Sequence, residues 1–375
     1  MKKWGVIFLV LATTFCTPNS DEFNKDSLEA LSSSREVDFS SINNLDFGYI
    51  HSVSSDSNGN IYVLDWGRQS VLIFTENGKL IREFENRGEG PGEYLSIREI
   101  YIKNDFLYIV DDNNLRISKF KISNSDGDLT HIKDTLYPDR AFTRIEHFFV
   151  IDEDTYAFVF LKDGFSAHNL WDDKFAGLQL FDWKRQKYNE ILEVPGREYF
   201  RFENERGWGI RPLAFGTYPY FMFHEGEFYY GDNSEFNIDK YNLSGELVTT
   251  FQSINIDPIS VPQNERMGEI NDDYYVDRNI QKDAREQLPE EWRIYNSFLI
   301  DDENRLWISM NQQGHSEGGL WWVFDEFGNG LYKLELEVPS KFLLIHNNNI
   351  YGIETNDLGV QSLVKYSISG LEANI

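Results

Sequence analysis

The sequence contains one cysteine, few prolines and few basic residues. A single cysteine, Cys16, excludes a disulfide within the chain, so the fold depends on its core for stability. With 10 prolines in 375 residues, the chain does not have the composition of a disordered linker protein. The 35 Lys and Arg are outnumbered by 62 Asp and Glu, which gives a net charge of −27. This balance disfavours nucleic acids and anionic membrane surfaces as partners.

The sequence also shows no hydrophobic run of about 20 residues, the length that spans a bilayer. A shorter apolar stretch, Trp4 to Phe15, follows Lys2 and Lys3, and this arrangement is typical of a secretory signal peptide. We therefore expect residues 1–15 to be a signal peptide and the protein to be exported.

Cys16 stands where the apolar stretch ends, which resembles the lipidation site of a bacterial lipoprotein. Phe15 departs from that pattern, because the preceding residue is usually small. We expect a lipid anchor at Cys16, a flexible tether over residues 16–34, and a location in the cell envelope, either the periplasm or the outer membrane. Simple secretion is the alternative. Contact with a membrane is expected only through this anchor, and we expect a monomer.

What the chain does have is aromatic residues, 15% of the total, and a repeated strand–turn pattern. Each repeat has short apolar strands separated by turns rich in Asp, Asn and Gly, such as Asn58-Gly59 and Asn77-Gly78, which suit tight hairpins. Six segments follow this pattern: Tyr49–Phe84, Ile97–Tyr137, Ile145–Val194, Leu213–Phe251, Phe298–Val338 and Phe342–Ser369. The pattern predicts an all-β, six-bladed propeller of four-stranded antiparallel blades over residues 35–375. A β-sandwich is the main rival, but it needs only about seven to nine strands, and the pattern predicts roughly twenty or more.

The sixth repeat is one strand short, which indicates how the ring closes. Arg35–Ile42 alternates apolar and polar residues and precedes the first repeat. We expect this N-terminal segment to form the outermost strand of the last blade, because closure removes an exposed sheet edge.

The longest connections gather on one side of the predicted propeller. In such a fold, the loop between the second and third strands opens on the same face as the crossing between blades. Lys162–Ala176, Gly196–Pro212, Ser253–Tyr295 and Asn311–Gly319 all belong to these two classes. We call this side the long-loop face. Insertions on one face commonly mark the binding side of a repeat protein.

The largest connection contains a run of helix formers. We expect a short helical insertion at about residues 263–294, between blades four and five. It serves either as a packing cap or as a lid or partner surface.

Three motifs carry a family resemblance: DSNGNIYVLD, RGEGPGEY and the later DDENRLWIS after LPEEW. Together they resemble a bacterial six-bladed β-propeller family related to NHL repeats. The resemblance implies the propeller fold and an exported lipoprotein. It implies little about chemistry, because such propellers include binding scaffolds and enzymes.

Signals for catalysis are weak. Gly314-His315-Ser316-Glu317-Gly318 matches the nucleophile-elbow pattern, but a strand follows it where that motif requires a helix. His51 and His147 are predicted near the starts of innermost strands, and His224 and His346 near strand ends. Three histidines at one level of the channel are not evident, so we predict no metal site, and the sequence identifies no cofactor.

The long-loop face is also rich in Trp, Arg and His, residue types enriched at binding surfaces. The candidate ligand-binding residues are Trp66, Arg68, Arg87, His168, Trp171, Arg197, Trp208, Arg211 and His315. Their arginines could receive a carboxylate or phosphate, or could pair with neighbouring acidic residues and merely fix the loops.

The sequence therefore favours an exported propeller that binds a ligand or protein partner through its long-loop face. An enzyme, either a hydrolase or a lyase with metal assistance at the channel mouth, is the alternative.

Overall fold

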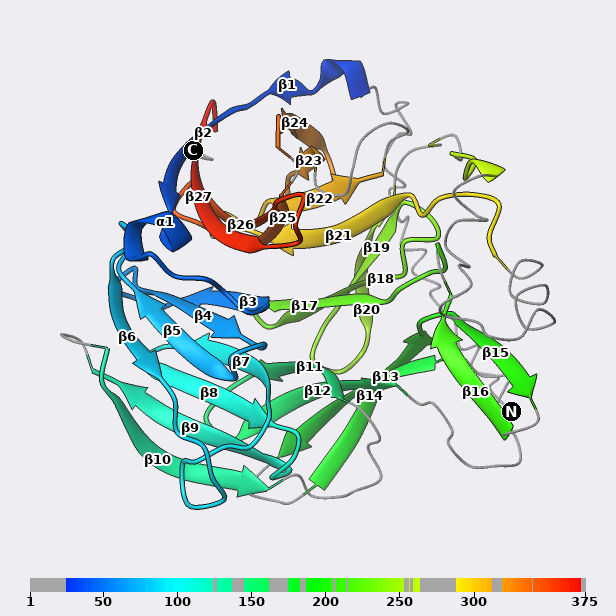
Figure 1. Cartoon of the computed structure of the whole chain (residues 1–375). Coiled ribbons are helices and arrows are strands. Elements are labelled where there is room, and N and C mark those ends of the chain that lie inside the picture. Colours follow the sequence, from blue (N-terminus) through cyan, green and yellow to red (C-terminus); the bar gives the residue numbers. More distant parts are fainter. Residues whose placement is uncertain are drawn as a thin grey trace, which may run out of the picture.

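The computed structural model describes residues 25–123, 127–136, 145–161, 175–182, 187–204, 207–213, 215–252, 256, 259–263, 288–311, 319–338 and 340–371. Within these residues, six antiparallel sheets of at least four strands surround a central axis (Figure 1). The predicted six-bladed β-propeller is confirmed. No helix in the described part of the chain is long and apolar enough to cross a membrane.

The blades follow the chain, and each begins at its innermost strand. Blade one comprises β3 (Ile50–Ser55), β4 (Ile61–Asp65), β5 (Ser70–Phe74) and β6 (Leu80–Phe84). Blade two comprises β7 (Ile97–Lys103), β8 (Phe106–Asp111), β9 (Arg116–Ile122) and β10 (Leu129–Leu136). Blade three comprises β11 (Ile145–Val150), β12 (Thr155–Leu161), β13 (Phe175–Asp182) and β14 (Lys187–Pro195).

The second half of the ring has the same order. Blade four comprises β17 (Tyr220–His224), β18 (Glu227–Gly231), β19 (Asn237–Tyr241) and β20 (Leu247–Gln252). Blade five comprises β21 (Tyr295–Ile300), β22 (Leu306–Met310), β23 (Leu320–Phe324) and β24 (Gly330–Glu335). Blade six comprises β25 (Lys341–His346), β26 (Asn349–Thr355) and β27 (Gln361–Ser369), with β2 (Ser32–Asp38) outermost.

The N-terminal segment closes the ring as expected. Strand β2 pairs antiparallel with β27, and the two lie side by side in Figure 1. Before it come a 3-10 turn (Lys25–Ser27) and the short strand β1 (Glu29–Ala30), which pairs parallel with β24 of blade five. The segment therefore joins the sheets of blades five and six.

The closing strand is shorter at its C-terminal end than expected. Residues Phe39–Asn43 form a short helix, α1, because Asp38 caps it by accepting the Ser41 N–H at 3.0 Å. The Asn43 side chain then donates to Gly78 O at 2.7 Å and accepts from Leu80 N at 2.9 Å. Helix α1 thus fastens the end of blade six onto blade one.

The core is divided among the interfaces between blades. Six clusters of buried hydrophobic side chains are present, and each joins two adjacent blades. Strands β4, β5, β22 and β23 are buried at every position, as expected where both faces of a sheet are covered. Every blade therefore depends on both of its neighbours.

Two connections on the long-loop face contain paired backbone. Between blades three and four, strands β15 (Tyr199–Asn204) and β16 (Gly207–Pro212) form a separate hairpin. Between blades four and five, the two ends of the insertion pair through the bridge Ser260–Glu291. Residues 264–287 of the helical insertion expected at about 263–294 lie outside the described part of the chain, as does Ser316.

The turn between β5 and β6 tests the closure. Gly78 has φ +82°, and a Cβ on it would lie 2.5 Å from Val37 Cγ1 of the closing strand. Gly226 has φ +86°, but open space surrounds its Cβ position. Both Ala variants incur the cost of a left-handed backbone, about 1–2 kcal/mol. We expect Gly78→Ala to lower the free energy of unfolding by about 1–3 kcal/mol more than Gly226→Ala, because of the added clash.

Chemical denaturation of both variants measures this difference. Equal losses would show that the closing strand does not pack against this turn as described.

Candidate functional site

The inner strands share an irregularity near their starts. In five of them the register with the second strand shifts after the first paired residue, leaving one extra residue. The extra residues are His51, Arg98, Glu146, Asn296 and Leu343, in β3, β7, β11, β21 and β25. A bulge takes such a residue out of the ladder and re-aims its side chain. The five bulge residues therefore form a ring where the crossings reach the central channel.

Polar side chains from three blades meet at this ring. Arg98 Nη2 lies 3.7 Å from Glu146 Oε2, so the bulges of blades two and three form an ion pair. Tyr218, just before β17, donates to the same carboxylate oxygen at 3.4 Å. The guanidinium of Arg197 lies 5.1 Å from the centre of the Tyr218 ring, a cation–π distance.

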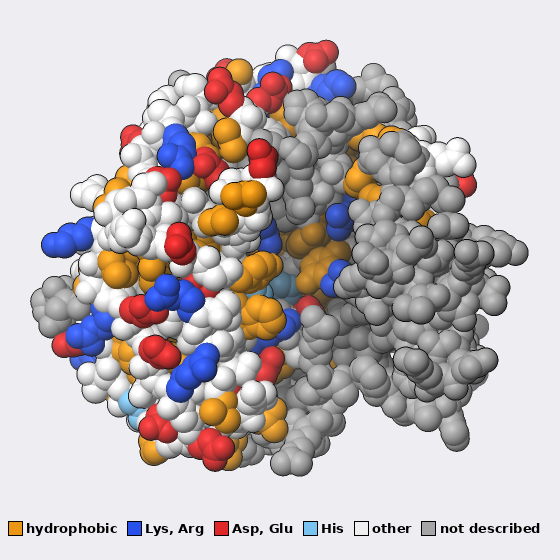
Figure 2. Space-filling model, in the orientation of Figure 1, with side chains coloured by type: hydrophobic (Ala, Val, Ile, Leu, Met, Phe, Trp, Pro, Cys, Tyr) orange, Lys and Arg blue, Asp and Glu red, His pale blue; other side chains and the backbone are white. Residues whose placement is uncertain are grey.

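A narrow cleft lies between blades three and four. It is lined by Glu146, His147, Val159, Arg197, Tyr218, Pro219 and Phe221. The His147 ring stacks on Phe149 with ring centres 6.1 Å apart. Its Nε2 is buried and has no hydrogen-bond partner among the described residues. Figure 2 shows a hollow near the middle of the view in which basic, histidine and hydrophobic side chains are visible.

Both histidines of this region are neutral at pH 7. The pKa of His147 is lowered to about 4, chiefly by burial, with smaller effects from Arg98 and His51. Burial also lowers the pKa of His51 to about 4, with Arg98 and Lys341 adding to the effect. Each ring can thus donate one hydrogen bond and accept another. We define the channel-mouth cluster as His51, Arg98, Glu146, His147, Arg197, Tyr218 and Lys341.

A partly buried carboxyl group lies beside this cluster. Glu99 Oε2 accepts the Phe148 N–H at 3.1 Å, which links blade two to blade three. Burial raises the pKa of Glu99 to about 8, although Arg98 opposes the shift. Glu99 is therefore mostly protonated at neutral pH and adds little negative charge.

Basic side chains elsewhere are mostly paired with carboxylates. Arg35, Arg68, Arg82, Arg116 and Arg305 each have an acidic partner. Arg197, Arg293 and Lys341 have none among the described residues. Lys341 begins inner strand β25 and Arg293 lies just before inner strand β21, whereas Arg197 lies between β14 and β15.

The predicted site residues separate into two groups. Arg197 belongs to the channel-mouth cluster. Trp66 lies beside it, 44% exposed, with its ring centre 6.2 Å from that of His51. Arg68 instead pairs with Glu83 of its own blade at 2.9 Å, so it fixes a loop. Arg87 is exposed and lies 3.9 Å from Glu85.

The remaining predicted residues are not placed. Trp208 and Arg211 belong to strand β16, but their side chains lie outside the described part of the structure. His168, Trp171, His315 and Cys16 also lie outside it.

Five functional candidates were missed from the sequence: Arg98, Glu99, Glu146, Tyr218 and Lys341. The signal was present, because inner strands begin with two polar residues between two apolar ones, as in Ile97-Arg98-Glu99-Ile100. The strict alternation expected of a strand hides this pattern, which a bulge produces.

The described residues contain no group of three or more side chains that could hold a metal ion. His224 and His346 end strands β17 and β25, and they bond Asn304 at 2.6 Å and Asp302 at 2.8 Å, respectively. They therefore stand at the opposite end of the inner strands from His51 and His147, as expected.

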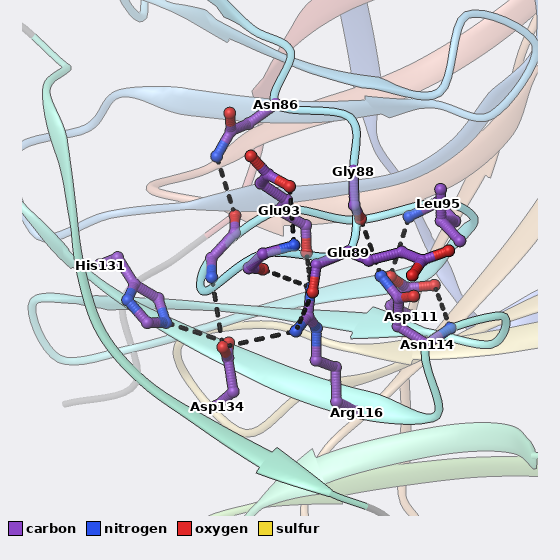
Figure 3. A network of polar contacts seen from close by, with 12 residues as sticks. Asn86, Gly88, Glu89, Glu93, Leu95, Asp111, Asn114, Arg116, His131 and Asp134 are labelled. Carbon is purple, nitrogen blue, oxygen red and sulfur yellow. Dashed lines mark hydrogen bonds and ion pairs between the residues drawn. The ribbon is translucent and has the colours of Figure 1, made fainter.

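The glycine-rich crossing Gly88–Glu93 proves to be structural (Figure 3). Arg116 of β9 donates to Glu89 O at 3.2 Å and to Gly90 O at 2.7 Å, and lies 3.6 Å from Asp134. The loop thus wraps around a buried guanidinium and satisfies it with backbone carbonyls. It connects blades one and two.

Comparisons with known proteins agree on the fold. The model of family DUF5128, described as a 6-bladed beta-propeller, matches residues 29–203. No curated protein was found to match the sequence.

Solved structures of similar shape include a candidate exported protein from Bacteroides fragilis, with 10% identity and a TM-score of 0.54, covering 93% of this chain and 98% of that one. A Bacteroides thetaiotaomicron protein of unknown function has 12% identity and a TM-score of 0.47, covering 92% and 74% of the two chains. A streptogramin B lyase has 9% identity and a TM-score of 0.46, covering 90% and 98%. At 10% identity, the similarity to the Bacteroides fragilis protein supports the fold alone.

The raised pKa of Glu99 makes stability depend on pH. The folded state binds this proton more tightly than the unfolded state does. The stabilisation by protonated Glu99 is therefore fully present below about pH 4.5 and is lost as the pH rises to about 8. We expect the free energy of unfolding of Glu99→Gln, which keeps the acceptor for Phe148, to rise by about 2–4 kcal/mol relative to that of the native protein across this interval.

Urea unfolding at a series of pH values measures the gain. Glu326→Gln, in an exposed turn, serves as the control and should run parallel to the native protein. A Glu99→Gln curve that also runs parallel would contradict the burial of Glu99.

Proposed function

We propose that this chain is an exported, lipid-anchored β-propeller that binds a ligand through its long-loop face, at the mouth of the central channel. The Bacteroides fragilis protein of similar fold is itself described as an exported protein. The signal-like residues 1–15 and Cys16 support export and a lipid anchor in the cell envelope. A relation to NHL-repeat propellers, suggested by the sequence motifs, remains part of this proposal.

One observation carries the proposal. In a protein with net charge −27, two neutral histidines and basic side chains that have no carboxylate partner in the described part of the chain gather at one end of the channel. Structural arginines elsewhere, such as Arg68 and Arg116, are satisfied by the protein itself. Polar groups held in place without partners are what a binding site presents before its ligand arrives.

Exposed apolar side chains flank the same region. Tyr49, Trp66, Leu95, Leu115, Leu358 and Val360 all lie on connections of blades six, one and two that open on the long-loop face, and we call them the apolar rim. The Tyr49 and Trp66 rings contact each other with centres 6.1 Å apart. An exposed apolar patch beside a polar cluster is typical of a recognition site. We propose no nucleic-acid partner and a monomer.

Catalysis at the same mouth is the second candidate, and one observation favours it. Glu99 is protonated and His147 is neutral at pH 7, and opposite shifts of this kind can assign an acid and a base. A panel of esters and lactones, with and without added divalent metal, tests for turnover. Turnover lost in His147→Gln but kept in Glu326→Gln would favour a hydrolase or lyase.

An exposed aromatic residue on each face permits a matched test of the binding site. Trp66 lies on the long-loop face, and Phe327, 79% exposed, lies in the β23–β24 turn on the opposite face. A library of neutral and charged aromatic fragments is screened by ligand-observed NMR. We expect Trp66→Ala to weaken binding of the fragment hits by about tenfold or more, as loss of a central aromatic contact does.

Phe327→Ala is the control and should leave the same hits unchanged. The reverse result, with binding lost in Phe327→Ala and kept in Trp66→Ala, would place the site on the opposite face and contradict the proposal.

A further inference from the structure

We infer that the channel-mouth cluster binds an organic anion, a carboxylate or phosphate group carried by an aromatic or otherwise apolar body. This inference rests on the proposed function and specifies its ligand class. Three features support it: cations without carboxylate partners among the described residues, buried nitrogens without hydrogen-bond partners among them, and the apolar rim.

Arg197 and Lys341 provide the charge. Arg197 contacts the Tyr218 ring but has no carboxylate partner among the described residues, and neither has Lys341. Glu198, next to Arg197 in sequence, faces the backbone of blade four and accepts the Thr217 N–H at 3.0 Å. A guanidinium without a carboxylate partner is the preferred protein group for a carboxylate or phosphate.

Three buried nitrogens near the starts of the inner strands also lack hydrogen-bond partners in the described part of the chain. They are His147 Nε2 in blade three, Arg293 Nε just before blade five and Asn296 Nδ2 at the blade-five bulge. Arg293 Nε and Asn296 Nδ2 are donors, and Asn296 is only 3% exposed. A buried donor without an acceptor costs about 1–3 kcal/mol, so an acceptor-rich ligand or bound water would relieve this cost.

The bulge explains why these groups gather without satisfying one another. Five of the six blades contribute an extra residue near the start of the inner strand, and adjacent inner strands hold these side chains in a ring. Arg98 and Glu146 pair across one interface at 3.7 Å, longer than a close ion pair. A ligand oxygen near Arg98 would therefore compete with a weak contact rather than a strong one.

The apolar rim specifies the rest of the ligand. Trp66 stands between Tyr49 and His51, with ring centres 6.1 and 6.2 Å away. An aromatic body resting on Trp66 would bring an attached anionic group toward His51 and so toward Arg98 and Lys341, both of which act on the pKa of His51. Because the cleft between blades three and four is narrow, the ligand would lie across the mouth rather than deep in the channel.

Calorimetric titration with three related probes tests the inference. Phenyl phosphate and phenylacetate are anionic, and phenylacetamide has nearly the shape of phenylacetate without its charge. We expect at least one anion to bind about tenfold or more tightly than the amide, a difference of about 1.4 kcal/mol. Its affinity should fall when sodium chloride is raised from about 50 to about 500 mM. The two anions distinguish a phosphate from a carboxylate ligand.

Two variants locate the charge. Arg197→Met and Lys341→Met remove cations that have no ion pair among the described residues, so both should fold. Each variant should weaken binding of the anion about fivefold or more, because a charge-assisted hydrogen bond to the anion is lost. Binding of the uncharged amide should be unchanged. Lys79→Met is the matched control, because Lys79 is an exposed lysine without a carboxylate partner among the described residues, in a turn of blade one. It should bind like the native protein.

The inference is overturned if the amide binds as tightly as both anions, if neither anion binds, or if Lys79→Met weakens the anion as much as Lys341→Met. Failure of the anionic ligand class can be distinguished from failure of the proposed function. Neutral fragments that depend on Trp66, together with no preference for anions, would retain the proposed function and overturn only the anionic ligand class.

Discussion

Closure of the ring by strand β2 is the constraint on which the rest of the structure depends. Each core cluster joins two blades, so an open ring would expose two half-interfaces. The closing strand continues into α1, where Phe39 is buried between blades six and one and seals the last of these interfaces. Closure also assembles the site, because Lys341 of blade six acts on His51 of blade one only when these blades are adjacent.

The repeated bulge separates the two duties of each inner strand. Apolar residues on either side of it, such as Ile50 and Val53, anchor the strand in the clusters between blades. The bulge residues between them are free of the ladder and can differ from blade to blade without loss of the core. A ring of similar scaffolds thus carries histidine, arginine, glutamate, asparagine and leucine at one level.

Much of the fold could be predicted from the sequence because its signals are local. Turn residues such as Asn58-Gly59 and the short apolar strands between turns predicted the hairpins, and the short sixth repeat together with the alternating residues Arg35–Ile42 predicted the closing strand. The site was harder to predict, since Arg68 and Arg197 look alike in sequence and differ only in what they meet. Glu83 pairs with Arg68 through sheet register, and the position of Arg98 depends on a bulge. Neither is visible in residue types alone.

The central claim is that the mouth of the closed channel is a site for an anionic ligand. The most direct measurement is a crystal structure of the protein with phenyl phosphate bound. The account predicts a phosphate within hydrogen-bond distance of a cation or histidine of the channel-mouth cluster, with its ring toward Trp66. A phosphate bound on the outer strands or at the opposite end of the channel, with the mouth filled by water alone, would contradict it.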